Sequence, residues 1–125
     1  MRIPMALAAA ALLVGGPASV DAHHSMAMFD QTSEVVVTGT VRQFQWSNPH
    51  AYIQLVGEDS AGQPVEWSLE LGSPVYLYAR GWRPRTLRPG MEVRARINPL
   101  RSGRPGGAVL EVSDMQGNAI GSNRR

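Results

Sequence analysis

The chain has 125 residues, contains no cysteine and carries a formal net charge of +2. This length allows one domain with a single hydrophobic core, and the lack of cysteine excludes disulfide bonds, a cysteine nucleophile and a lipidated cysteine anchor. So small a net charge also argues against nucleic acid as a partner.

Residues 1–22 have the pattern of an export signal. A positive start is followed by an unbroken apolar run at residues 5–14, and a signal-peptidase pattern ends at Ala22. Because this run has about half of the ~20 residues that a helix needs to span a bilayer, we expect a cleaved signal rather than a membrane span. Cleavage after Ala22 would make His23 the first residue of a periplasmic or secreted protein. Cleavage after Ala18 is the alternative.

An N-terminal arm and a long strand are expected after the signal. Residues 23–33 are predicted to form an extended arm. Residues 34–46 are rich in Val and Thr and predict the first strand, with Gly39 at a bulge or bend. A Ser-Asn-Pro turn at residues 47–49 ends this strand.

The next two strands are predicted to form a hairpin. Residues 50–56 and 65–71 are the strands, and residues 59–62 are the loop between them. Burial of one face favours a single register. Its pairs are Ile53 with Leu69 and Leu55 with Trp67 on the core face, and Tyr52 with Glu70 and Gln54 with Ser68 on a more polar face. His50 belongs to the polar face.

A short helix and two further strands complete the domain. Residues 73–81 begin with Ser-Pro and end with Gly, which predicts a capped helix over residues 75–80. Alternating apolar and charged side chains predict a fourth strand at residues 91–97, and residues 108–115 predict a fifth. The Gly-, Asn- and Arg-rich residues 117–125 predict a flexible tail.

The order of these elements indicates the fold. Three strands, a helix and two strands follow one another in the OB-fold, a five-stranded Greek-key barrel with its helix between strands three and four. We therefore predict an all-β, OB-fold-like barrel domain over residues 34–116. A small open β-sandwich is the alternative.

Short sequence blocks are spread over nearly all of the chain after residue 22. They are His23-His24-Ser25 with Phe29-Asp30, Gly39-Thr40-Val41, Trp46-x-Asn48-Pro49-His50, Trp67-x-x-Glu70, Ser73-Pro74, Gly81-Trp82 and Leu87-x-Pro89-Gly90. In these blocks the chain resembles a bacterial family of small exported proteins that share a domain of unknown function. The resemblance implies export and an OB-like barrel, but no activity. Met26 and Met28 depart from the family pattern.

Three histidines suggest a metal site. After cleavage at Ala22, His23 would chelate through its α-amine and ring, and His24 or His50 would complete a histidine brace. Alternatively, His24 would bind through its ring, the deprotonated amide before it and the amine. Such nitrogen ligands favour Cu(II), with Ni(II) and Zn(II) as alternatives. The competing interpretations are that the histidine pair is a polar arm and that His50 only hydrogen-bonds the turn backbone.

Other side chains are better explained by packing or by a function that needs no metal. Met26 and Met28 are expected to pack the arm against the barrel rather than to bind Cu(I). A metal-free module would instead bind a small ligand or a periplasmic partner protein on a face made of Trp46, Tyr52, Gln54 and Glu70. A copper histidine brace can support oxidative catalysis, but no substrate and no nucleophile–base constellation is indicated. We therefore do not expect an enzyme.

The basic residues are unevenly distributed. All twelve are arginine, and eight of them lie between residues 80 and 104. We expect a solvated face that Glu66, Glu70 and Glu92 partly neutralise, rather than an anion-binding surface.

Overall fold

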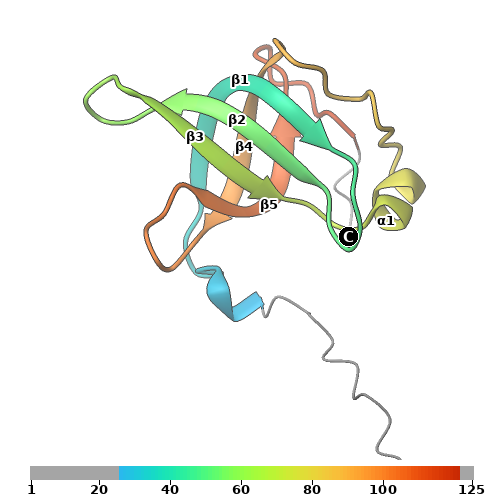
Figure 1. Ribbon diagram of the computed structural model, residues 1–125, viewed down its shortest axis with the longest axis horizontal. Helices are drawn as coiled ribbons and strands as arrows, with labels where there is room; N and C mark the ends of the chain where they lie inside the picture. The colour runs from blue at the N-terminus through green and yellow to red at the C-terminus, as the bar shows by residue number, and fades with distance from the viewer. Residues whose placement is uncertain (1–25, 122–125) are drawn as a thin grey trace, which may run out of the picture.

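The computed structural model describes residues 26–121, which form a closed five-stranded β-barrel (Figure 1). Its elements are the 3₁₀ turn η1 (Met26–Met28), β1 (Val35–Gln45), β2 (Tyr52–Glu58), β3 (Pro64–Glu70), α1 (Pro74–Ala79), β4 (Glu92–Pro99) and β5 (Gly106–Ser113). The strand order is β1-β2-β3-β5-β4, and β4 pairs with β1 to close the barrel. This order confirms the predicted all-β, OB-fold-like barrel over the open sandwich.

The β2–β3 hairpin has the predicted register. All four predicted pairs are present, from Tyr52–Glu70 to Leu55–Trp67. Ile53 and Leu55 are fully buried in the barrel core, and Trp67 packs partly buried against that core. A shift by one residue would turn these apolar side chains to the outer face, which is why burial selects this register.

Strand β1 has its bulge at Arg42, not at the predicted Gly39. Val41 pairs with Leu55 and Gln43 with Gln54, which leaves Arg42 as the extra residue on β1. Gly39 has a different role, because a Cβ there would collide with the carbonyl oxygen of Val56. The glycine therefore allows the backbones of β1 and β2 to approach closely.

Helix α1 has the predicted N-cap and terminal glycine, and each of its bounds lies one residue before the predicted range 75–80. The Ser73 hydroxyl accepts a hydrogen bond from the Tyr76 amide at 3.3 Å, and a proline occupies the first turn. Gly81 adopts a φ of +84°, which suits glycine at a helix end. Leu77 and the fully buried Trp82 pack this segment onto the core. No helix within residues 26–121 is long and apolar enough to cross a membrane.

The described part of the segment before β1 is fixed to the barrel. Met26–Met28 form the turn η1. Phe29 is only 2 % exposed and forms an isolated antiparallel bridge with Leu100. The Asp30 amide donates to the Pro99 carbonyl at 2.8 Å. The arm is therefore anchored through a buried aromatic ring beside the β4–β5 connection.

The end of the described chain also returns to the sheet. Ala119 forms a bridge with Ser113, and the Ile120 amide donates to the Val112 carbonyl at 2.8 Å. Residues 117–121 therefore lie in a hydrogen-bonded return beside β5.

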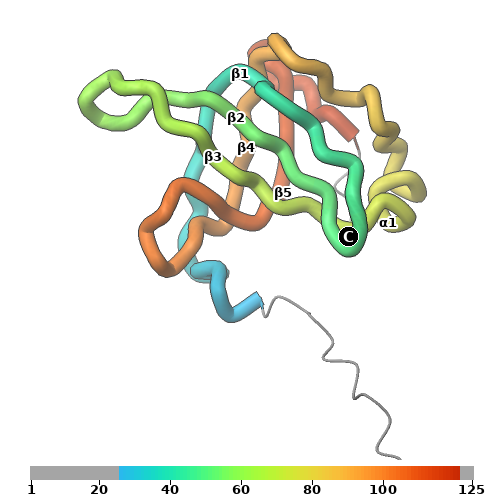
Figure 2. The backbone as a smooth tube through the Cα atoms, viewed as in Figure 1, coloured from blue at the N-terminus to red at the C-terminus, as the bar shows by residue number. Residues whose placement is uncertain are grey.

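The ladder between β3 and β5 is the shortest in the barrel. Strands β3 and β5 are parallel and pair only at Ser68–Gly106, Leu69–Gly107 and Glu70–Ala108, whereas the other neighbouring strands are antiparallel. The backbone trace shows α1 outside the strands at one end of the barrel, and the β2–β3 and β4–β5 loops toward the other (Figure 2).

Candidate functional site

Two hollows border the N-terminal segment. The first, which we call the His50 pocket, has a volume of about 300 Å³ and includes Met26 in its lining. The second, the Tyr52 groove, has a volume of about 450 Å³ and includes Met28 and Phe29. Glu70 contributes to both hollows.

The His50 pocket combines an apolar lining with several polar groups. It is formed by η1, His50 before β2, the end of β3 with the β3–α1 connection, α1 with the turn after it, and β5. The apolar lining includes Leu71, Leu77, Trp82, Val109 and Leu110, and the polar side chains are His50, Glu70, Tyr76 and Arg80. Leu77 belongs to α1 and Trp82 to the turn after it. The caps of the helix fix where this segment begins and ends, and so they also determine the shape of the pocket.

His50 is held by contacts on both its backbone and its ring. Its carbonyl accepts a hydrogen bond from the Ser47 hydroxyl at 2.8 Å, and its Nδ1 lies 3.1 Å from the Leu71 carbonyl oxygen. A carbonyl can only accept, so Nδ1 carries the hydrogen in this contact. In the neutral ring the lone pair then lies on Nε2, which is the form that can bind a metal ion.

A carboxylate supports the same ring. Oε1 of Glu70 lies 3.6 Å from Nδ1 of His50, and the Glu70 side chain is only 12 % exposed. The other carboxylate oxygen lies 3.5 Å from the Tyr52 hydroxyl. Burial raises the pKa of Tyr52, and the neighbouring Glu70 carboxylate raises it further. Glu70 therefore connects the His50 pocket with the Tyr52 groove.

The Tyr52 groove lies over the polar face of the β2–β3 hairpin. Tyr52, Gln54 and Glu70, three of the four residues predicted for a ligand-binding face, all line it. The Gln54 amide donates to Oε1 of Gln45 at 2.8 Å and to the Ser68 hydroxyl at 3.2 Å. These bonds orient the polar floor of the groove.

Trp46, the fourth residue predicted for that face, does not line the groove. Its ring is half-buried and meets the Phe44 ring edge-on, with centroids 5.8 Å apart. Trp46 packs against the core cluster rather than offering an open stacking surface.

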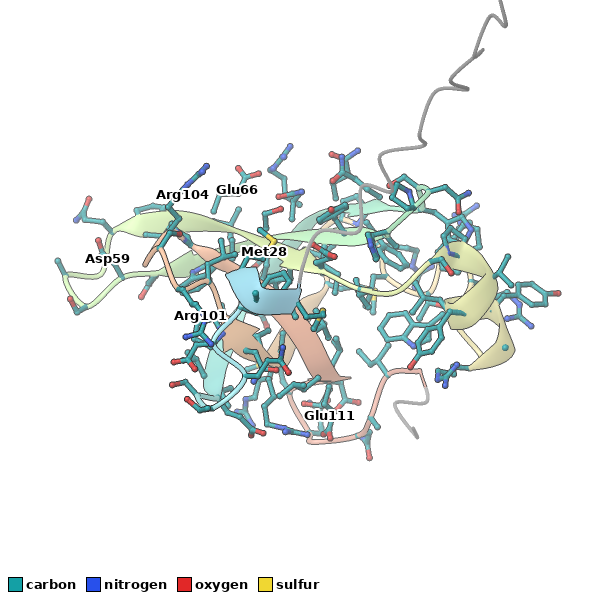
Figure 3. All side chains as sticks on the ribbon, turned by 90° about the horizontal axis from the view of Figure 1, so that it is seen from below. Met28, Asp59, Glu66, Arg101, Arg104 and Glu111 are labelled. Carbon is teal, nitrogen blue, oxygen red and sulfur yellow. The ribbon has the colours of Figure 1, made fainter. Side chains whose placement is uncertain are left out.

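The rim of the Tyr52 groove carries both signs of charge. Glu66 and Arg104 line it, and both project to the same side of the barrel in Figure 3. Glu66 accepts a 2.9 Å hydrogen bond from Nε of the bulged Arg42. The bulge in β1 therefore supplies the cation that balances this acidic rim residue.

Of the three predicted metal ligands, only His50 belongs to the described part of the chain. His23 and His24, like the predicted signal at residues 1–22, lie outside it. Within residues 26–121, no group of three or more His, Cys, Asp or Glu side chains is arranged to hold a metal ion. The described link between the arm and His50 is Met26, three residues after His23, which lines the same pocket.

Sequence reasoning missed two polar residues of the His50 pocket, Tyr76 and Arg80. The Arg80 guanidinium carbon lies 3.4 Å from the centroid of the Tyr76 ring. The two residues are four positions apart, and this spacing brings side chains together on a helix. That spacing was the available signal.

Comparison with known proteins places the chain in one family. No curated protein and no solved structure matches the chain. A family model described as "Family of unknown function (DUF6152)" matches residues 10–109. This match confirms the recognised resemblance to a family with a domain of unknown function, and the chain belongs to the DUF6152 family.

Proposed function

We propose that this protein is exported and binds one divalent metal ion, with Cu(II) favoured, through its processed N terminus and His50. The α-amine and ring of His23 would provide two nitrogen ligands, and the ring of His50 or His24 a third. Cleavage after Ala22 is a condition, because only then does His23 carry a free amine. The observation that carries the proposal is the position of Met26 in the lining of the His50 pocket.

Chain length supports this assignment. An extended chain advances about 3.3–3.6 Å per residue, so His23 can lie no more than roughly 10 Å from Met26. Phe29 fixes the arm to the barrel through its buried ring. This reach is compatible with a ligand set that joins the new N terminus to His50.

The setting of the His50 ring also supports the proposal. Histidines that bind metals usually donate their other ring N–H to a carbonyl or a carboxylate, which fixes the ring and its tautomer. Nδ1 of His50 has both kinds of group nearby, the Leu71 carbonyl at 3.1 Å and the Glu70 carboxylate at 3.6 Å. Nε2 is then the nitrogen that would face the metal.

The ligand types favour copper. An amine with two imidazole rings is an all-nitrogen set, which suits the tetragonal geometry of Cu(II), and Cu(II) binds nitrogen sites more strongly than Ni(II) or Zn(II). The chain has no cysteine thiolate that would favour a softer metal.

The decisive experiment compares two N termini. We expect the chain that starts at His23 to bind one Cu(II), with nitrogen hyperfine structure in its electron paramagnetic resonance spectrum. Acetylation of the His23 α-amine should weaken binding by at least roughly a hundred-fold, because it removes a ligand and groups that only orient a ligand already contribute 10–100-fold. Equal affinity of the two forms would exclude the terminal amine as a ligand. Intact mass of the exported protein tests the cleavage site.

A second function rests on a separate observation. Three residues predicted for ligand binding line the Tyr52 groove, which offers hydroxyl, amide and carboxylate groups beside apolar surface. A metal-free module would bind a small polar ligand or a partner protein there. Full complementation of a deletion strain by a His23→Ala, His50→Ala variant would favour this function over metal binding.

A further inference from the structure

One surface of the molecule combines exposed apolar side chains with arginines. Helix α1 exposes Val75, Tyr76 and Tyr78, of which Val75 is the most exposed at 80 %. The helix lies outside the barrel, and the chain continues along the same side of the molecule toward β4 (Figure 1). We call this the α1 surface; it comprises Val75, Tyr76, Tyr78, Arg80, Arg83, Arg85 and Arg88.

The charge of this surface is not neutralised in the way the sequence suggested. Residues 71–91 contain four arginines and no acidic residue, so the rest of the chain has a formal net charge of −2. Two of the acids expected to neutralise arginines in this region have other partners: Glu66 pairs with Arg42, and Glu70 meets His50. Within residues 26–121, no ion pair involves Arg85 or Arg88.

Two of the arginines are fixed on tyrosine rings. The Arg80 guanidinium lies 3.4 Å from the Tyr76 ring centroid, and that of Arg83 lies 3.6 Å from the Tyr78 centroid. Arg83 also donates to the carbonyl oxygen of Tyr78 at 3.0 Å. These contacts hold each guanidinium against a tyrosine ring. The two rings nevertheless stay accessible to solvent, since Tyr76 is 44 % exposed and Tyr78 is 58 % exposed.

We propose that the α1 surface binds the surface of an anionic lipid bilayer. Tyrosine favours the boundary between headgroups and hydrocarbon, and clustered arginines attract anionic headgroups. Val75 and Tyr78 are exposed on this short helix, whereas Tyr76 and Arg80 also line the His50 pocket. Exposed apolar side chains beside four arginines and no acidic residue match a bilayer surface, which offers anionic headgroups next to hydrocarbon. The proposal is independent of metal binding.

Vesicle binding by the chain that starts at His23 tests this proposal. The apolar residues 5–14 are omitted because they would enter bilayers themselves. With a metal chelator present, we expect binding to phosphatidylglycerol-containing vesicles, weak binding to phosphatidylcholine vesicles, and loss of affinity with added salt. Arg85→Gln with Arg88→Gln should weaken binding by roughly twenty-fold.

A matched pair of substitutions separates this surface from net charge. Arg101→Gln with Arg104→Gln removes the same charge from the β4–β5 connection, on the side of the barrel away from α1 (Figure 3). We expect this control pair to retain most of the affinity. An equal loss in both pairs, or no binding to anionic vesicles, would overturn the proposal, and so would binding to an acidic protein alone.

Because the chain has no cysteine, a single introduced thiol can report contact with lipid. A polarity-sensitive dye on Val75→Cys should shift to the blue with anionic vesicles. The same dye on Ser60→Cys, in the exposed β2–β3 loop, should not shift. Binding without a shift at position 75 would show that another surface meets the membrane and would overturn the assignment to α1.

Discussion

The His50 pocket and the Tyr52 groove are built around the same two features and differ in what they can bind. Both include Glu70, and each contacts one end of the turn η1, through Met26 or Met28. The pocket has deep apolar walls from α1 and β5 with the histidine among its polar groups. The groove lies over the polar face of one hairpin, is bordered by Phe29, Leu100 and Pro105, and is lined by no histidine. Under the proposed functions, a metal ion would bind in the first hollow and a small polar ligand in the second.

This difference shows why the N-terminal segment matters. Neither hollow is formed by the barrel strands alone, since methionines of η1 line both. The buried ring of Phe29 fixes that turn. Releasing the segment should therefore affect both hollows, whereas a substitution at a residue that lines only one of them should affect only that one.

The largest expected effect comes from Phe29→Ala. Removing this buried ring should lower the free energy of unfolding by about 3 kcal/mol, at the lower end for aromatic truncations because the site lies at the edge of the barrel. It should also weaken Cu(II) binding, since the arm loses its anchor. Urea unfolding and copper titration measure the two effects. Met28→Ala, at a 41 % exposed neighbour, is the control and should change stability little. A stability loss no larger than that of the control would show that the arm is not fixed to the barrel.

A smaller effect, confined to one hollow, is expected for His50→Gln. The substitution removes a nitrogen ligand and should weaken Cu(II) binding by roughly ten- to a hundred-fold, as estimated from losses around metal-bound histidines. Gln54→Ala, in the Tyr52 groove, is the matched control and should leave copper affinity unchanged. Isothermal titration with both variants checks this. Unchanged affinity after His50→Gln would mean that only the two N-terminal histidines bind the metal. Copper would then not bind in the His50 pocket.

The smallest expected effect is a loss of stability at low pH that depends on Asp30, in the segment before β1. Asp30 accepts hydrogen bonds from the hydroxyls of Thr32 and Ser33 and from the Thr32 amide, which lower its pKa to about 2. The folded pKa is depressed, so the stabilisation is present above the ordinary value near 3.8 and is lost as the pH falls toward about 2. The temperature of thermal unfolding should therefore fall more steeply between pH 5 and pH 2 for the native chain than for the Asp30→Asn variant. Parallel profiles would contradict this role.

The hairpin and the helix could be predicted in detail because their determinants are local. The alternation from Tyr52 to Leu55 fixes one register once one face is buried. Ser73 and Gly81 supply the two caps of α1. The element order then favoured the barrel, since few topologies fit three strands, a helix and two strands.

Features that depend on distant contacts were not predictable from local pattern. The bulge lies at Arg42, where a cation meets Glu66 twenty-four residues away, and Gly39 instead permits a close approach of two backbones. The His50 pocket draws its walls from five separate segments. The sequence placed His50 on the polar face, but its contact with the Leu71 carbonyl depends on how the chain turns after β3.

The short ladder between β3 and β5 has a thermodynamic consequence. Its three pairs make it the place where the fewest hydrogen bonds resist separation of neighbouring strands. Ser68, Glu70 and Gly107 line the Tyr52 groove, while Glu70 and Ala108 line the His50 pocket. A molecule that binds in either hollow therefore touches both strands of this ladder. Occupancy is linked to barrel opening, and a bound metal or ligand should slow amide hydrogen exchange at these strands more than elsewhere.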